Sequence, residues 1–343
     1  MNRALRRVGT VVLIVALTAY PLVANQFWTV QVGVRALWLG IVGLSLVFLA
    51  GYGGMVSLAQ TAVYGVAGYG VAIISVKYGL SWLVAIPAAI AVAVAFAALV
   101  GLITVRAQGV YFLMITLACG VTTYYFTLQA QTITNGHTGL TGVSPPYLQN
   151  LFDLSQPKQF YYAALLVAAL AYLGVRYLKD TPFGSALQGV RDNPERMRAL
   201  GYHVEALRLL AFCIAGFVAA LGGVIAVYYN GQIAPDSINV TATIDILVLT
   251  VLGGLRRPAG AFVGALLFAL LGNFASDYTE RYNTLIGLVF LLVILFSPSG
   301  VLGLADKARD RLRAPRDRAD PESTASLSGT AGPSSISSSK GQS

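Results

Sequence analysis

The chain has 343 residues, of which 56% are apolar and 11% charged, and its mean hydropathy is +0.70. Soluble domains average about 25% charged residues, so this composition excludes an ordinary soluble enzyme and a disordered chain and indicates a protein that lies in a lipid bilayer. The net charge of +9 does not indicate nucleic-acid binding, because the basic residues follow the membrane topology described below.

Long apolar runs predict ten membrane spans, since each crossing needs about 20 mostly apolar residues. One run is too short for a full crossing, so at least one short or half helix is expected. The first run also resembles a signal peptide, and the sequence leaves open whether it is cleaved. The predicted spans are residues 8–25, 33–51, 53–77, 82–105, 109–128, 160–178, 207–228, 243–255 (the short run), 258–276 and 284–300.

The ten spans divide into two sets of five around the loop at 129–159. An odd number of spans in each half gives the halves opposite orientations, which permits an inverted repeat. The predicted fold is therefore an all-α polytopic membrane protein with about ten transmembrane helices in two inverted five-helix repeats. Residues 1–304 are predicted to form the transmembrane domain, and the Ser- and Gly-rich residues 305–343 a disordered cytoplasmic tail.

The basic residues predict the orientation of these spans. With the N-terminus in the cytoplasm, 19 of the 23 Lys and Arg residues fall on the cytoplasmic side, and only Arg35, Lys77, Lys158 and Arg281 fall outside. Cytoplasmic loops of membrane proteins carry an excess of Lys and Arg. We therefore predict that both termini are cytoplasmic and that the 129–159 loop is outside.

Polar side chains form stripes on the third and fifth predicted spans. Their spacing of three and four residues places each stripe on one helix face. The stripes indicate either a weakly polar translocation path or close helix packing with hydroxyl groups bonded across the interface, and the sequence leaves both interpretations open. The residues assigned to the path are Ser57, Gln60, Thr61, Tyr64, Thr116, Thr123 and Asp245.

Asp245 is the one carboxylate that falls within a predicted span. Near the outer start of the short run, an acid caps the helix or interacts favourably with its dipole, and the alternative is a side chain that faces the path. The GxxxG pattern at Gly260 and Gly264 predicts close helix packing.

The sequence contains no motif for catalysis, metal binding or a cofactor. It has no GxxxxGK[ST] phosphate loop, no HExxH and no cluster of Cys and His. The chain itself is therefore not expected to hydrolyse ATP. Buried acids, which ion-coupled carriers usually need, are also scarce, and this weighs against a carrier that works alone.

A cytoplasmic loop carries two sets of helix-capping signals. Thr181–Pro182 and Asn193–Pro194 each place a capping side chain before a proline at the first helical position. Gly201 is expected to end the second helix in a left-handed conformation. These signals predict two short helices, near 182–191 and 194–200.

Two capped, charged helices between membrane spans favour a docking element over a solvated connector. We expect Glu195 to offer a charged contact, Met197 and Leu200 to fill a partner's groove, and Arg191 and Asp192 to orient the second helix. The residues assigned to this loop, which covers 179–206, are Gly184, Arg191, Asp192, Asn193, Pro194, Glu195, Met197, Leu200 and Gly201.

The loop sequence FGSALQGVRDNPERMRALGYHVEALRLLAF resembles the cytoplasmic loop of branched-chain amino-acid ABC transporter permeases of the LivM type. The resemblance covers residues 35–304 and includes, in order, GYGGMVSLAQTAVYGVAGYG, GVYFLMITLA, TNGHTGLTGV, VLGGLRRPAGAFVGALL and FSPSGVLGL. Ala59 and Val63 replace the more usual glycine and phenylalanine, and Ser185 stands where an arginine is common. These departures leave the substrate open.

The resemblance implies a permease subunit of an ATP-driven importer of branched-chain amino acids in the bacterial inner membrane. A periplasmic binding protein would deliver the substrate, a second homologous permease would complete the path as a heterodimer, and two cytoplasmic ABC ATPase subunits would drive transport through the 179–206 loop. Urea and short-chain amide permeases have very similar sequences and are the alternative. A stand-alone secondary carrier would need no cytoplasmic partner.

Overall fold

The computed structural model describes residues 18–21, 28–148, 152–154, 156–255 and 257–278, together with positions 287 and 300. The first and last predicted spans lie almost entirely outside these residues, and the predicted tail at 305–343 lies outside them completely.

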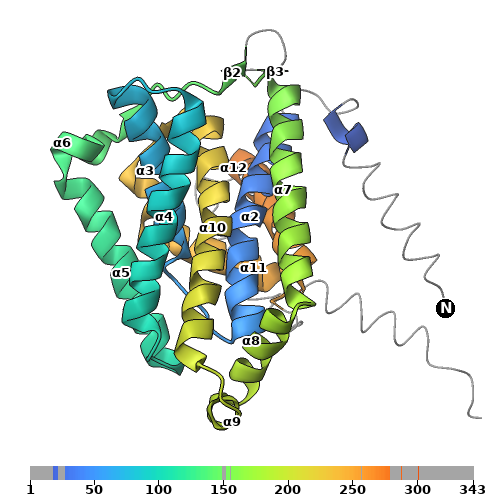
Figure 1. Cartoon of the computed structure of the whole chain (residues 1–343). Helices are drawn as coiled ribbons and strands as arrows, with labels where there is room; N and C mark the ends of the chain where they lie inside the picture. Colours follow the sequence, from blue (N-terminus) through green and yellow to red (C-terminus); the bar gives the residue numbers. More distant parts are fainter. Residues whose placement is uncertain are drawn as a thin grey trace, which may run out of the picture. The chain divides into compact units, whose positions relative to one another are not determined.

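Most of the long helices run along one common axis (Figure 1). At one end of this axis, here called the loop end, lie α8 (Pro182–Asp192) and α9 (Pro194–Ala199). The opposite end, here called the strand end, carries two antiparallel strand pairs and short helices. These elements are β1 (Leu140–Thr141) paired with β4 (Gln232–Ile233), β2 (Tyr147–Leu148) paired with β3 (Phe152–Asp153), α6 (Gln131–Thr134), η4 (Gly136–Thr138) and η5 (Pro235–Ile238).

Five of the predicted spans are confirmed as helices that are long and apolar enough to cross a membrane. In the first of them, α2 (Arg35–Val47) is extended by π-helical turns η1 (Trp28–Val34) and η2 (Phe48–Tyr52), so that the apolar span covers Gln31–Tyr52. The other four are α4 (Trp82–Thr104), α5 (Gly109–Gln129), α7 (Pro157–Lys179) and α10 (Val204–Asn230).

The third predicted span, 53–77, is wrong as a continuous helix. Its helical part begins only at α3 (Gln60–Ala72), which continues into the π-helical stretch η3 (Ile73–Lys77). Residues 54–57 have no regular structure. Gly54 has a φ of +68°, a left-handed conformation that only glycine adopts without strain, and it interrupts the helix at this point.

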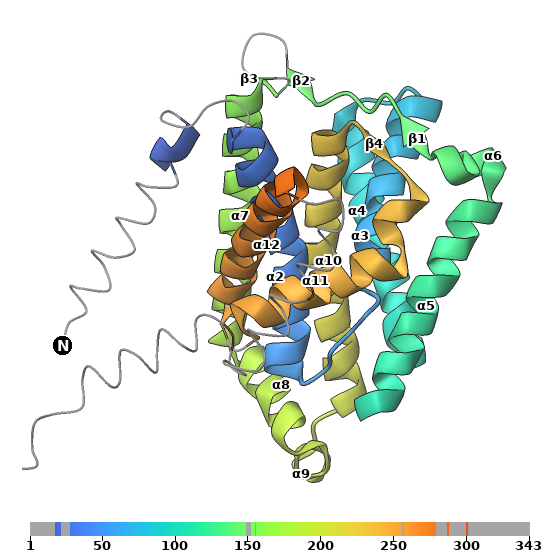
Figure 2. The same ribbon diagram turned by 180° about the vertical axis from the view of Figure 1, so that it is seen from behind.

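The two predicted crossings at 243–255 and 258–276 are not two separate straight spans. They form α11 (Val240–Gly253) and α12 (Pro258–Tyr278), which meet at an angle of 117°. Figure 2 shows α11 lying across the bundle. Counted by length and composition, the described helices give five spans, or six if the bent pair is one, so a count of ten is not confirmed. The inverted repeat stays a prediction.

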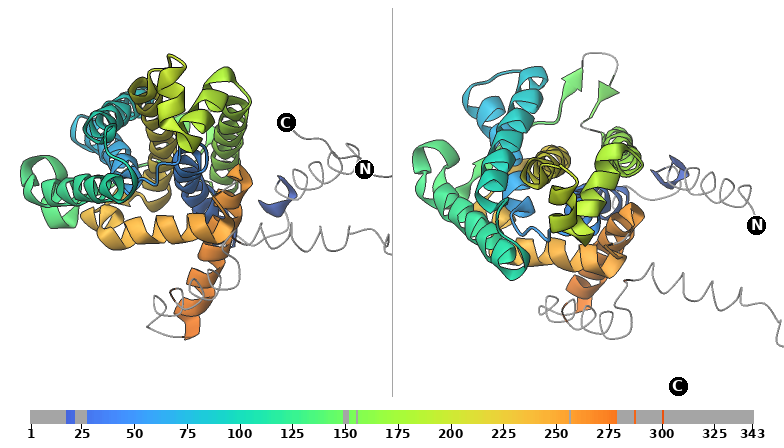
Figure 3. Two further views of the ribbon diagram at one scale, coloured as in Figure 1. Left: turned by 90° about the horizontal axis from the view of Figure 1, so that it is seen from below. Right: turned by 60° about the horizontal axis from the view of Figure 1, so that its bottom comes forward.

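Helix α10 lies at the centre of the described bundle, against α2, α3 and α4 (Figures 1 and 3). Small residues permit this close packing: a Cβ atom added at Gly223 would overlap the Tyr64 carbonyl oxygen, and one added at Gly216 would overlap the Ala97 side chain. The two glycines of the GxxxG pattern likewise press against the backbone of α11, which confirms the predicted helix packing there.

Helix α5 lies at the edge of the bundle, where the figures agree in showing few neighbours (Figures 1 and 2). Only one face of it is buried, and that face is the predicted polar stripe with Phe112 at its loop end. The remaining surface is mostly large and apolar, including Tyr111, Met114 and Phe126, which suits contact with lipid or with another membrane subunit.

Candidate functional site

The break before α3 leaves backbone groups without helical partners between two apolar helical segments. Such a segment is tolerated only where it is buried in protein and its polar groups are satisfied. The Met55 amide donates to the Leu49 carbonyl oxygen at 3.1 Å, and the Ala59 amide donates to Ser57 Oγ at 3.2 Å. Ser57, assigned to the path, therefore bonds the backbone of the break itself.

Thr116 of α5 completes this set of hydrogen bonds. Its Oγ1 accepts from the Leu58 amide at 3.2 Å and donates to the carbonyl oxygens of Phe112 and Leu113, at 3.0 Å from each. The hydroxyl group therefore connects the irregular segment to a helix 58 residues further along the chain. The structure thus brings Ser57 and Thr116, from the two predicted stripes, to the same helix break.

Two residues of the stripe on α3 contact α2. Gln60 Oε1 accepts from Ser45 Oγ at 3.2 Å, and the Tyr64 ring stacks on Trp38 with centroids 5.8 Å apart and planes 11° apart. Sequence reasoning missed Ser45 and Trp38, because single residues in an apolar span give no spacing signal. These contacts fit the packing interpretation of this stripe.

The six path candidates on α3, on α5 and at the break are enclosed in this conformation, with none more than 8% exposed. Two polar groups at the α2–α3 contact, Gln60 Nε2 and Trp38 Nε1, are buried without a hydrogen-bond partner. Nearly all buried polar groups in proteins are bonded, so these two donors are available to an incoming acceptor. Access to them requires neighbouring helices to move apart. The enclosed candidates are Ser57, Gln60, Thr61, Tyr64, Thr116 and Thr123.

Two path candidates, Thr123 and Asp245, take no part in the hydrogen bonds described above for the helix break. Thr123 donates to the Cys119 carbonyl oxygen of its own helix at 2.8 Å. Asp245 is half-buried within α11 and does not cap it, since the Asn239 side chain accepts from the Ala242 amide at 2.8 Å. The expectation that Asp245 caps the helix is therefore wrong. The sequence signal for this cap was Asn239, because Asn is a preferred residue at the N-terminal cap of a helix.

Both caps predicted in the 179–206 loop are present. The Gly184 amide donates to Thr181 Oγ1 at 3.3 Å, and the Arg196 amide donates to Asn193 Oδ1 at 2.9 Å. Prolines occupy the first turns of both helices, as expected. Gly184 also lies close to the end of α7, since an added Cβ would overlap the Leu178 carbonyl oxygen.

Gly201 ends α9 as predicted, with a φ of +87°. Its amide donates to the Arg198 carbonyl oxygen at 2.9 Å, and the Tyr202 amide donates to the Met197 carbonyl oxygen at 3.0 Å. These two bonds define a Schellman motif, which needs a left-handed residue at this position. The length of α9 is thus fixed at both ends.

Met197 does not face outward, which corrects the prediction that it fills a partner's groove. The side chain is only 9% exposed and packs over Gly189 in a cluster with Ala186, Val190 and Val204. The outer surface of α9 instead carries Glu195 and Arg196, and Leu200 just beyond its end is 66% exposed.

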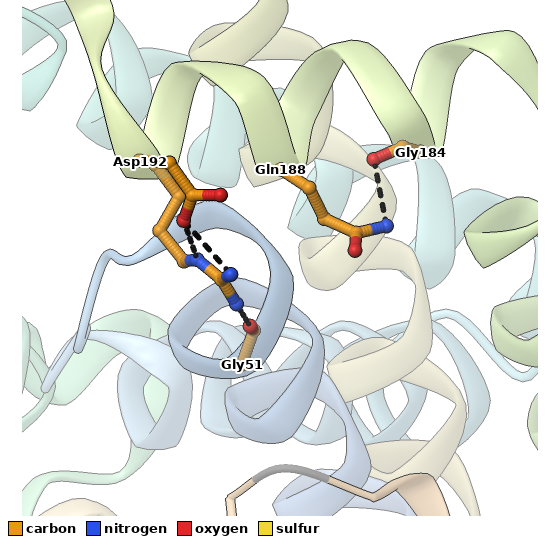
Figure 4. Close-up of polar contacts among 5 residues, drawn as sticks. Gly51, Gly184, Gln188 and Asp192 are labelled. Atoms are coloured by element: carbon orange, nitrogen blue, oxygen red, sulfur yellow. Dashed lines mark hydrogen bonds and ion pairs between the residues drawn. The ribbon is translucent and has the colours of Figure 1, made fainter. Parts of the chain in front are cut away.

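The prediction that Arg191 and Asp192 orient the second helix stays a prediction. They form an ion pair with each other at 2.9 Å, and Arg191 Nη1 reaches the Gly51 carbonyl oxygen at 2.6 Å, rather than α9 (Figure 4). A second arginine, Arg198, pairs with Glu205 at the start of α10 at 2.7 Å. The loop is therefore attached to α2 and to α10 by different arginines.

The chain matches one protein family over residues 29–298, described as "Branched-chain amino acid transport system / permease component". It is 25% identical over 314 residues to the high-affinity branched-chain amino acid transport system permease protein LivM of Escherichia coli K12, a match that covers 85% of this chain and 74% of that protein. No solved structure matches the chain.

Two further relatives match a shorter part of the chain. The autoinducer 2 import system permease protein LsrC of Escherichia coli O9:H4 is 31% identical over 163 residues, which are 43% of this chain and 46% of that protein. The probable branched-chain amino acid transport permease protein LivH of Methanocaldococcus jannaschii is 26% identical over 171 residues, 47% of this chain and 54% of that protein.

Proposed function

The chain belongs to the family of permease components of branched-chain amino acid transport systems, and on that premise we propose that it is one permease subunit of an ATP-driven importer. The proposed cargo is branched-chain amino acids. The observation that carries the proposal beyond the family is the loop formed by α8 and α9, in which both helices are capped and α9 is charged and exposed. A subunit that receives force from a separate ATPase needs such an element.

A permease subunit of an ATP-driven importer works with three kinds of partner. A second homologous permease would pack beside this chain, two cytoplasmic ABC ATPase subunits would bind at the loop end, and a periplasmic binding protein would deliver the substrate at the strand end. The exposed apolar surfaces of α4, α5 and α7 offer area for the second permease and for lipid.

The proposed translocation path runs along the helix break, α3 and the polar face of α5. Its side chains are weakly polar and enclosed, so transport would require alternation between this closed arrangement and an opened one. Buried donors such as Gln60 Nε2 would then meet the carboxylate or amide of a passing substrate.

The proposed location is the bacterial inner membrane, with both termini and the loop end in the cytoplasm. Its support is the distribution of Lys and Arg. Thr138 at the strand end and Ser185 on α8 are both exposed, so a cysteine at either position can be labelled. In intact cells, Thr138→Cys should react with an impermeant thiol reagent and Ser185→Cys should not. The opposite result would reverse the orientation.

The function is tested by reconstituting the chain in proteoliposomes with a second permease, ATPases and binding protein encoded beside it. Uptake of labelled leucine should require ATP hydrolysis and should stop when the ATPases carry an inactivating substitution. Uptake that persists with inactive ATPases would instead support a stand-alone carrier. Competition by unlabelled leucine, urea or acetamide distinguishes the amino-acid proposal from the urea or amide alternative.

The docking role of α9 is tested by charge reversal. Glu195→Arg should reduce co-purification of the ATPase subunits and the ATP hydrolysis that substrate stimulates, because Glu195 is exposed on the outer side of α9. Asp180→Arg is the matched control, since Asp180 is an exposed acid at the same end but outside α9. Equal effects of the two substitutions would contradict docking through α9.

A further inference from the structure

Arg191 connects the end of α8 to the end of η2, 140 residues earlier in the chain. Its guanidinium group uses three of its donors: Nη1 bonds the Gly51 carbonyl oxygen at 2.6 Å, while Nε and Nη2 both bond Asp192 Oδ1 at 2.9 Å (Figure 4). The last carbonyl groups of a helix lack intrahelical partners, so Gly51 presents a free acceptor at this position.

The stem of Arg191 makes a second contact with the same segment. A Cβ atom added at Gly54 would lie 2.5 Å from Arg191 Cγ, so the side chain passes over a position where only glycine leaves room. Gly54 is the residue whose positive φ interrupts the third predicted span. Arg191 therefore holds both the carbonyl that ends the π-helical turn and the residue at which the chain turns away.

The segment that Arg191 contacts is linked to α5 and to the turn between α11 and α12. Towards its C-terminus it continues to Leu58, whose amide is bonded to Thr116 of α5. On its other side Gly51 presses against the backbone of Leu255, in the turn between α11 and α12, where an added Cβ would overlap the Leu255 carbonyl oxygen. A displacement of Gly51 would thus reach the α11–α12 turn by direct contact, and α5 along the chain through the Leu58–Thr116 bond.

We propose that Arg191 is a positioning residue that transmits movement of the α8–α9 loop to the helix break at residues 51–59. The inference rests on the proposed function, in which an ATPase moves this loop. Arginine suits the role because its planar fork donates in fixed directions, and Asp192 fixes the orientation of that fork. Lysine would keep the charge but could not reproduce this set of bonds.

The simpler interpretation is that Arg191 is a solvated basic residue that only helps to orient the chain in the membrane. Its side chain is 39% exposed, which fits either interpretation. The two interpretations differ for Arg191→Lys, which keeps the orienting charge and removes the fork. Arg176→Gln is the matched control, because Arg176 is an exposed arginine on the last turn of α7 at the same end.

The experiment uses the assembled complex with its ATPases in nanodiscs, for wild type, Arg191→Lys, Arg191→Gln and Arg176→Gln. Hydrogen exchange is measured for peptides covering 50–59, where the Gly53 and Met55 amides both bond the Leu49 carbonyl oxygen. Both Arg191 substitutions should make this exchange at least about tenfold faster, with α10 unchanged. They should lower the substrate stimulation of ATP hydrolysis about fivefold or more, with ATPase co-purification unchanged. Arg176→Gln should match wild type.

Wild-type exchange in 50–59 for Arg191→Lys and Arg191→Gln would overturn the proposal. If exchange in 50–59 becomes faster but substrate still stimulates ATP hydrolysis as in wild type, Arg191 holds the segment but does not transmit movement, and the proposal is overturned. If the wild-type chain binds no ATPase, the proposed function fails, and the exchange result still decides the contact. If both Arg191 substitutions also raise exchange in α10, Asp192→Asn becomes the test variant. Asp192→Asn keeps the Arg191 guanidinium group but weakens the ion pair that orients it, so it should raise exchange in 50–59 alone. Unchanged exchange in 50–59 would overturn the proposal.

Discussion

Helix α3 has two unlike neighbours, α10 and α5. Against α10 the contact is made by glycines on both helices: Gly223 presses on the Tyr64 carbonyl oxygen, and Gly68 on Val227. Towards α5 the polar contacts are made by hydroxyl groups: Thr116 bonds the irregular segment before α3, and Tyr69 of α3 interacts with Thr127 of α5. Close backbone packing cannot open gradually, whereas one hydrogen bond can break and re-form. The difference predicts that α3 and α10 would move as one body and that the proposed path would open beside α5.

The largest effect should come from adding volume at the α3–α10 contact. In Gly223→Val the new side chain meets backbone that cannot yield, so we expect a loss of about 3 kcal/mol or more in stability. Size-exclusion chromatography in detergent should show loss of the monodisperse peak. Gly174→Val is the control, because an added Cβ at Gly174 on α7 meets nothing within 4 Å. A monodisperse Gly223→Val protein would contradict the comparison, because it would show that the α3–α10 contact can widen without loss of the fold.

A smaller effect is expected when the hydroxyl that bonds the break is removed. Thr116→Val keeps the volume of the side chain but leaves the part-buried Leu58 amide without its hydroxyl partner, a local cost of about 1 kcal/mol. Hydrogen exchange in residues 54–60 should become faster and leucine uptake should fall, while chromatography stays normal. Thr122→Val, at an exposed position of the same helix, controls for the loss of a hydroxyl from α5. Equal exchange in both variants would show that Thr116 does not hold the break.

The smallest effect is expected at a glycine on the α5 side. A Cβ added at Gly120 would lie 3.6 Å from the Leu58 carbonyl oxygen, an ordinary contact. Gly120→Ala should therefore change the thermal unfolding midpoint little, within about 0.5 kcal/mol of stability, and leave uptake near wild type. A loss as large as that of Gly223→Val would show that α5 is packed as tightly as α10.

The predictions that succeeded rest on local backbone chemistry. The caps at Thr181 and Asn193 and the left-handed Gly201 depend on residues within one helical turn, so the order of residues specifies them directly. The five confirmed spans depend on the length and hydropathy of single segments, which are likewise properties of neighbouring residues.

One failed prediction, the cap assigned to Asp245, could have been avoided from the local Asn239 signal. The other failures depended on contacts between different elements. Hydropathy is the same whether residues 53–59 are helical or extended, and the break is stable because Thr116 arrives from α5 to bond it. Met197 is buried because Gly189 leaves space on α8, and the pattern of α9 alone could not reveal that space.

The sequence by itself therefore determined that the chain is a helical membrane protein, where most long helices lie, and how the α8–α9 loop begins and ends. Only the tertiary structure decided which helices touch, where the third predicted span breaks and that Arg191 reaches Gly51. The physical reason is that apolar spans rich in Ala and Gly pack in many ways with similar local free energies. Backbone contacts and hydrogen bonds that form only when the whole bundle assembles determine which of these arrangements is adopted.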